Sequence, residues 1–101
     1  MTVLLVRYRT ADESVPEVVA AIEEAFAAVR ERQPDGIRYA YLRRAGTAEF
    51  IGLLELEDGA ENPLPGIEAA RRLQATVAAH AVGDPPAPVA YELLGTYRAF
   101  D

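Results

Sequence analysis

Two segments of this chain are apolar on both faces of an extended strand, and this limits the folds open to it. Residues 3–6 read Val-Leu-Leu-Val, and residues 50–54 read Phe-Ile-Gly-Leu-Leu. Because a strand alternates its side chains between the two faces of a sheet, such runs fit central strands that are covered on both sides. Residues 37–43 and 89–97 carry charged side chains, which is typical of edge strands. We therefore expect two central strands and two edge strands.

Two helical segments separate these strands. Residues 15–29 place apolar side chains at helical spacing, and Ser14 with Glu17 has the spacing of a capping box. Residues 34–36, Pro-Asp-Gly, predict the end of this helix. The second helix is expected over residues 67–81, with Gly83 as its C-terminal stop.

The strands are predicted at residues 3–9, 37–43, 49–57 and 89–97, with a hairpin turn at 45–47. Depending on the length of that turn, Tyr41 lies opposite Phe50 or Gly52. The order βαββαβ with a right-handed crossover predicts one ferredoxin-like α+β domain over residues 1–101. Its antiparallel sheet has the order 4-1-3-2, with both helices on one face.

The second face of this sheet would leave apolar side chains in water. Large exposed apolar patches are uncommon on monomers, so we expect an identical subunit to cover that face in a dimeric α/β-barrel.

Composition excludes several functional classes. The chain has no cysteine, which removes disulfides, zinc thiolates and cysteine nucleophiles and is typical of a cytosolic protein. The net charge of −6 argues against a nucleic-acid partner. No apolar run is long enough to cross a membrane, and the N-terminus is typical of a strand rather than of a signal peptide.

The candidate site residues are few. His80 is the only histidine, so any histidine-based proton transfer would need it; the alternative is a half-buried residue near a helix C-terminus. Tyr39 and Tyr41 fall on one strand face with Phe50, where phenols could bind or deprotonate an aromatic substrate or simply pack. Arg38 and Arg43 could hold an anionic group or guard the sheet edge. Tyr91 is a further candidate lining residue, and no metal site is expected.

The chain resembles the antibiotic biosynthesis monooxygenase-like branch of the dimeric α/β-barrel superfamily. The resemblance covers nearly the whole chain. It is carried by the element order, by residues 36–39 and 50–58, by residues 62–67 before the second helix, and by residues 92–98. It implies a substrate pocket between sheet and helices. It also implies oxygenation without a cofactor, in which the electron-rich ring of the substrate supplies electrons to O₂.

Haem-degrading relatives use an asparagine on the first strand, a tryptophan near the end of the third and a histidine on the second helix. This chain has no tryptophan, carries Leu56 near that position, and has its only asparagine at Asn62. No cofactor is therefore expected. Two functions remain open: a cofactor-independent monooxygenase of aromatic polyketide or quinol-like compounds, and a non-catalytic ligand-binding or accessory dimer.

Overall fold

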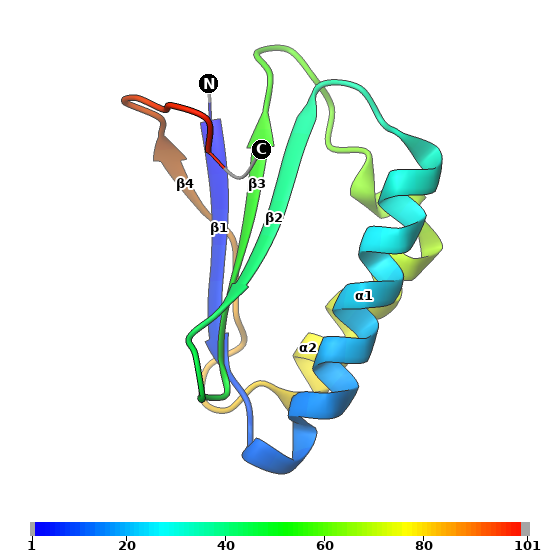
Figure 1. The fold of residues 1–101 in the computed structure, drawn as a ribbon, viewed down its shortest axis with the longest axis vertical. Coiled ribbons are helices and arrows are strands. Elements are labelled where there is room, and N and C mark those ends of the chain that lie inside the picture. The colour runs from blue at the N-terminus through cyan, green and yellow to red at the C-terminus, as the bar shows by residue number, and fades with distance from the viewer. Residues whose placement is uncertain (1, 100–101) are drawn as a thin grey trace.

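The structure is a computed structural model that describes residues 2–99, and its elements follow the predicted βαββαβ order (Figure 1). The strands and helices are β1 (Thr2–Arg9), α1 (Val15–Arg32), β2 (Ile37–Arg43), β3 (Glu49–Leu56), α2 (Glu68–His80) and β4 (Val89–Glu92). Two short 3-10 turns, η1 (Asp12–Ser14) and η2 (Leu64–Gly66), precede the helices.

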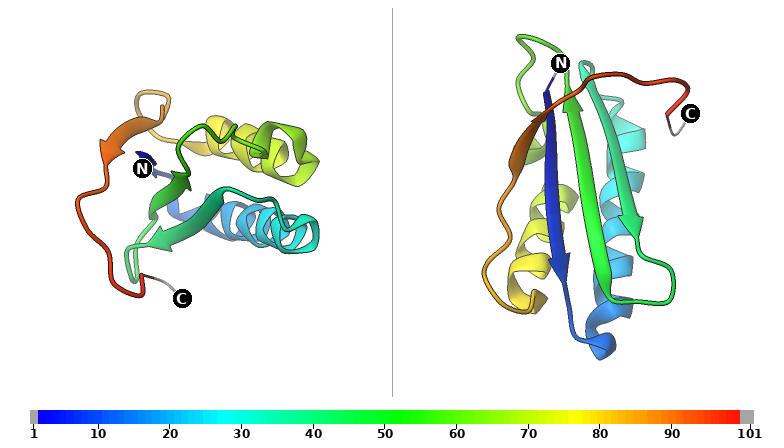
Figure 2. Two further views of the ribbon diagram at one scale, coloured as in Figure 1. Left: turned by 90° about the horizontal axis from the view of Figure 1, so that it is seen from above. Right: turned by 90° about the vertical axis from the view of Figure 1, so that its left-hand side faces the viewer.

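The strands form one antiparallel sheet in the order β2-β3-β1-β4, which is the predicted order 4-1-3-2 read from the other edge. The apolar strands β1 and β3 are central, as predicted. Figure 2 shows two layers, with α1 and α2 side by side on one face of the sheet. We call this the inner face and the opposite one the outer face. The ferredoxin-like α+β fold is therefore confirmed.

The register of the β2–β3 hairpin decides which side chains meet on the inner face. Tyr41 pairs with Gly52, and Tyr39 pairs with Leu54, so the structure selects Gly52 from the two partners left open for Tyr41. A Cβ atom at Gly52 would lie 3.0 Å from Cε2 of Tyr41. The ring of Tyr41 therefore lies over Gly52, where any larger residue would push it aside.

The core consists of two clusters on the inner face. One is built around Phe50, Tyr8 and Val18 and includes Leu73 and Val77 of α2. The other groups Leu54, Leu64, Ile67 and Ala70 near the opposite end of the sheet. Because α2 contributes to both clusters, it fixes the spacing of the helical layer from the sheet along its whole length.

The last strand is shorter than predicted. β4 ends at Glu92, whereas the sequence predicted a strand to residue 97. Glu92 lies opposite Thr2, the first residue of β1, so the pairing of the two strands ends where β1 begins. Residues 93–99 instead cross the outer face of the sheet (Figure 2).

Two helix-end predictions were wrong. Ser14 precedes α1, but its side chain makes no capping hydrogen bond, because Ser14 itself has helical φ and ψ within η1. The second helix ends at His80, one residue before the predicted end, and Gly83 is not its C′ residue. Ala81 is extended because it forms a β-bridge with Thr10, and the Val82 N–H donates to the Arg9 carbonyl oxygen at 2.7 Å.

Candidate functional site

A cavity of about 470 Å³ lies between the inner face of the sheet and α2. Its position follows from the β1–β3 register. The cross-strand pair Val6–Gly52 has little side-chain volume. The pairs on either side of it along the two strands, Tyr8–Phe50 and Leu4–Leu54, are bulkier. Each bulky pair belongs to one of the two core clusters, where its side chains fill the space between sheet and helices. The Val6–Gly52 pair between them leaves space beneath α2.

The lining of the cavity contains no charged side chain. Its polar side chains are the phenols of Tyr39 and Tyr41 and the carboxamides of Asn62 and Gln74. The remaining lining residues are Leu4, Val6, Gly52, Leu54, Leu64, Leu73, Val77, Ala78, Pro85, Pro86 and Pro88. The three prolines belong to the connector between α2 and β4, and their fixed φ angles make this part of the wall stiff.

Tyr39 and Tyr41 belong to a packed group of rings. The Tyr39 ring stacks on Phe26 of α1, with centroids 4.6 Å apart and planes 6° apart. The Tyr41 ring meets Tyr39 edge to face at 6.4 Å, and its hydroxyl lies 2.6 Å from the hydroxyl of Tyr8. These contacts leave the two phenols little freedom to move.

These phenols are neutral at physiological pH, as any tyrosine is, and burial moves their ionisation further into the alkaline range. Desolvation, aided by the nearby Tyr8, raises the pKa of Tyr39 to about 12. Desolvation also raises the pKa of Tyr41 well above its ordinary value, and the hydrogen bond with Tyr8 adds to this effect. Neutral phenols donate and accept hydrogen bonds but do not remove a proton from a substrate near pH 7.

His80 lies outside the cavity lining. Its Nε2 atom is 2.9 Å from Oε2 of Glu17, so the side chain joins the end of α2 to the start of α1. The His80 side chain is 27% exposed and that of Glu17 is 65% exposed. In this position His80 connects the two helices, and its catalytic role stays a prediction that the geometry does not favour.

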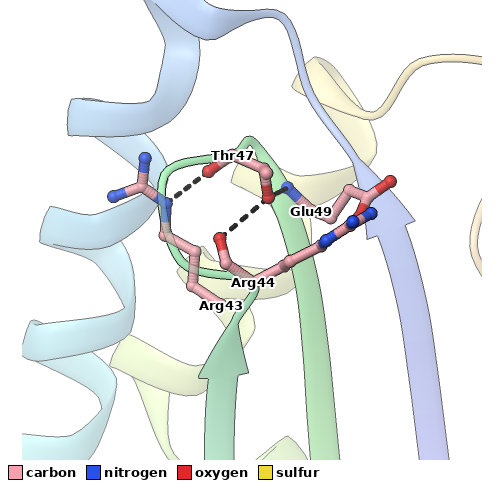
Figure 3. A network of polar contacts seen from close by, with 4 residues as sticks. All are labelled: Arg43, Arg44, Thr47 and Glu49. Atoms are coloured by element: carbon pink, nitrogen blue, oxygen red, sulfur yellow. Dashed lines mark hydrogen bonds and ion pairs between the residues drawn. The ribbon is translucent and has the colours of Figure 1, made fainter.

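The two candidate arginines lie away from the cavity. Arg38 is on the outer face, where it pairs with Glu55 across the β2–β3 ladder. Arg43 lies at the end of β2, and its Nε–H donates to the Thr47 carbonyl oxygen (Figure 3). Thr47 in turn donates to the Arg44 carbonyl oxygen at 2.8 Å, so Arg43 belongs to the polar network that holds the hairpin turn.

The other two candidates are also separate from the cavity. Phe50 is 1% exposed and stacks on Tyr8 with ring centroids 5.4 Å apart, so it supports the core. Tyr91 is 51% exposed on the edge strand β4, opposite Val3. Of the residues predicted from the sequence, Tyr39 and Tyr41 are the ones that line this cavity.

Sequence reasoning missed four contributors to the site. Tyr8 holds the Tyr41 hydroxyl, and Gly52 makes room for the Tyr41 ring. The carboxamide of Gln74 lines the cavity, as does that of Asn62, whose Oδ1 accepts a hydrogen bond from the Leu64 N–H at 3.0 Å. Tyr8 shares a face with Tyr41 through the registers of β1 with β3 and of β3 with β2, which alternation within a single strand does not give.

A second groove, of about 440 Å³, lies on the outer face beneath the C-terminal segment. Leu93, Thr96 and Ala99 of that segment lie over residues of β1, β2 and β3. Leu94 is 90% exposed and Tyr97 is 82% exposed. The segment therefore covers part of the outer face and presents apolar side chains of its own to the surroundings.

Within residues 2–99, no three His, Asp or Glu side chains come close enough together to hold a metal ion. Neither α1 nor α2 is long and apolar enough to cross a membrane.

No known family model matches the chain, and no curated protein matches it in sequence. Solved structures do match its fold. An antibiotic biosynthesis monooxygenase is 17% identical with a TM-score of 0.70 and covers 94% of this chain and all of its own. A putative antibiotic biosynthesis monooxygenase from Nitrosomonas europaea is 19% identical, with the same TM-score and the same coverage. A dimeric ferredoxin-like protein of unknown function from Jannaschia sp. is 10% identical, has a TM-score of 0.61, and covers 92% of this chain and all of its own. At these identities the likeness establishes the fold.

The raised phenol pKa values predict that the protein loses stability at alkaline pH. An unfolded tyrosine has a pKa of about 10. Between about pH 10 and 12 the unfolded chain therefore binds fewer protons than the folded chain, and the free energy of unfolding falls as pH rises. Below pH 10 the contribution is fully present. We expect Tyr39→Phe to make this fall less steep in urea unfolding measured from pH 8 to 12.

A suitable control is Leu56→Ala, which weakens the same core and keeps every tyrosine. Its unfolding free energy should be lower at all pH values but fall with the wild-type slope. Equal slopes for wild type and Tyr39→Phe would contradict the prediction.

Proposed function

We propose that the chain binds a neutral, largely apolar small molecule in the cavity beneath α2. The observation that carries this proposal is the lining, which has four uncharged polar side chains and no charged one. Its volume of about 470 Å³ lies within the usual range of small-molecule sites.

The same lining disfavours charged ligands. A carboxylate that entered this cavity would lose its hydration and meet no cation to compensate, which costs several kcal/mol or more. The phenols and carboxamides can instead satisfy a carbonyl or hydroxyl group. An uncharged aromatic or polycyclic compound with one or two such groups fits the site best.

Two neighbouring alanines on α2 provide a matched test. Both are exposed, but Ala78 lines the cavity and Ala79 is not part of the lining. Ala78→Trp should weaken the binding of a neutral tricyclic probe such as 9-fluorenone at least tenfold, because the indole occupies the cavity. Ala79→Trp should leave the affinity unchanged. Binding is measured from NMR chemical shifts.

The charge argument has its own control in the same experiment. The 4-carboxylate of 9-fluorenone should bind at least tenfold more weakly than 9-fluorenone itself. Equal affinity of the two probes, or equal effects of the two tryptophan substitutions, would contradict binding of a neutral ligand in this cavity.

A second candidate function is oxygenation without a cofactor. Two structural neighbours are named antibiotic biosynthesis monooxygenases, which favours this chemistry. A model reaction converts anthrone and one O₂ into anthraquinone and one water. The methylene carbon loses two hydrogens and gains a carbonyl oxygen. Since the cavity lining holds no base that acts near pH 7, the substrate would have to react through a neutral, electron-rich enol or quinol form.

Oxygen uptake distinguishes an enzyme from a non-catalytic binding or accessory protein. With anthrone, an oxygenase should consume O₂ faster than buffer alone, and Ala78→Trp should abolish the excess. His80→Ala should keep it, because His80 lies outside the cavity lining and pairs with Glu17. If the protein consumes no more O₂ than buffer with anthrones or quinols, it is not an oxygenase of these compounds, and non-catalytic binding is the function that stands. If His80→Ala loses the excess uptake, our placement of the site is wrong.

We also propose that two copies associate through the outer face. Apolar side chains from all four strands alternate onto it, among them Leu5, Leu42, Leu53 and Val89. Leu42, Val89 and Tyr91 are exposed, and the C-terminal segment covers only part of the face. The Jannaschia neighbour is described as dimeric. Burial of this face against a second copy would remove the apolar surface from water.

A charge at the centre of the outer face tests this association. Leu53→Glu should raise the dimer dissociation constant at least tenfold, because the carboxylate would be desolvated without a partner. Ala20→Glu, on the exposed side of α1, adds the same charge and should leave association unchanged. Sedimentation equilibrium gives both constants, and circular dichroism checks the fold. A wild-type chain that stays monomeric would contradict the proposal.

A further inference from the structure

A third groove, of about 590 Å³, lies at the end of the sheet where β1 finishes and the turn between β2 and β3 begins. Its lining contrasts with that of the cavity beneath α2, because it contains the charged residues Arg7, Arg9, Arg44 and Glu49. Three positive charges and one negative charge give this arginine groove a net charge of +2, in a chain whose net charge is −6. Positive charge is therefore concentrated at one place on an acidic molecule.

The register of the sheet brings these groups together. Arg7 and Arg9 alternate onto the same face of β1, about 7 Å apart along the strand. Because Tyr8 between them is buried in the core of the inner face, that face is the outer one. Arg9 lies opposite Glu49 on β3, and the Arg44 N–H donates to the Glu49 carbonyl oxygen at 3.0 Å. Arg9 and Arg44 therefore flank Glu49 in one row across three strands.

The arginines have few partners of their own. Neither Arg7 nor Arg9 makes a side-chain hydrogen bond or an ion pair with another of residues 2–99, and both are exposed. Nη1 of Arg44 lies 3.3 Å from Oε2 of Glu49 (Figure 3). Glu49 thus contributes one carboxylate to a groove with three guanidinium groups. An anion that entered the groove would reduce the repulsion between these like charges.

The groove also offers apolar surface next to the arginines. β4 pairs with β1 only as far as Leu5, so the edge of β1 is open beside Arg7. Ile51 and the half-exposed Val82 belong to the groove lining there. Arginines beside an open edge can also guard it against pairing with another strand. That role needs only their charge, and it selects no particular anion.

We infer that the arginine groove binds the phosphate monoester dianion of a small molecule, whose apolar part contacts Ile51 and Val82. The planar guanidinium group forms paired hydrogen bonds with phosphate oxygens, and a dianion matches the net charge of the groove. All the groups belong to one chain, so the site does not need a second copy. It is also separate from the cavity beneath α2 and independent of the neutral ligand proposed there.

The test measures binding of phenyl phosphate at constant ionic strength and pH 8, where the ester has lost its second proton, whose pKa is about 6. NMR signals of the arginine Nε–H groups report the occupied site. We expect a dissociation constant of about 1 mM, since exposed charges are screened by salt. Arg7→Gln and Arg9→Gln should each weaken binding at least threefold. Arg30→Gln removes the same charge from the exposed side of α1 and should leave the affinity within twofold of wild type.

A second pair of variants tests the site through a gain of affinity, which a damaged fold does not produce. Glu49→Gln removes the carboxylate of the groove and should tighten binding of phenyl phosphate at least twofold. Glu24→Gln removes the same charge from the exposed side of α1 and should leave the affinity unchanged. Phenol, which has the same ring without the phosphate group, should not shift the Nε–H signals of Arg7 and Arg9.

The opposite results would overturn the inference. A wild-type dissociation constant above about 10 mM would show that the groove is not a phosphate site. Equal weakening by Arg7→Gln and Arg30→Gln would show that only the overall charge of the chain matters. Tighter binding in Glu49→Gln but not in Glu24→Gln would support the site even if an arginine variant did not fold.

Discussion

The antiparallel pairing of β1 with β3 is the constraint on which the rest of the structure depends. Both strands are apolar on both sides, so their pairing is stable in water only if each face of the sheet is covered. The helices cover the inner face, and residues 93–99 begin to cover the outer one. The same register sets the small Val6–Gly52 pair beneath α2. One set of backbone pairs thus determines the layers, the edges and the position of the cavity.

Sequence patterns were sufficient for the fold because they act through strong, local physical effects. Two-sided apolar runs identified the central strands, charged side chains identified the edges, and the turn at 45–47 joined β2 to β3. The errors came from the element ends, where tertiary contacts compete with local propensity. Ala81 leaves α2 to bridge Thr10, and β4 ends at Glu92, opposite the first residue of β1. Neither competition is visible in the sequence around these residues.

The site was less predictable because it depends on register and on the rotation of helices, which residue type does not reveal. Strand alternation correctly placed Tyr39 and Tyr41 on one face. It could not show that His80 points to Glu17, since a residue at the border of a helical stripe can face either the sheet or the neighbouring helix. The role of Gly52 becomes apparent only when Tyr41 is known to pair with it.

The distribution of charge determines what chemistry the cavity can support. The chain carries a net charge of −6, and the ion pairs Arg72–Glu68 and Arg44–Glu49 lie on the exposed surface. The polar side chains that line the cavity are phenols, whose pKa values burial raises further above the physiological range, and carboxamides, which do not titrate. An interior of this kind stabilises no full charge on a ligand. A ligand bound there would be recognised through its shape and through hydrogen bonds to these uncharged groups.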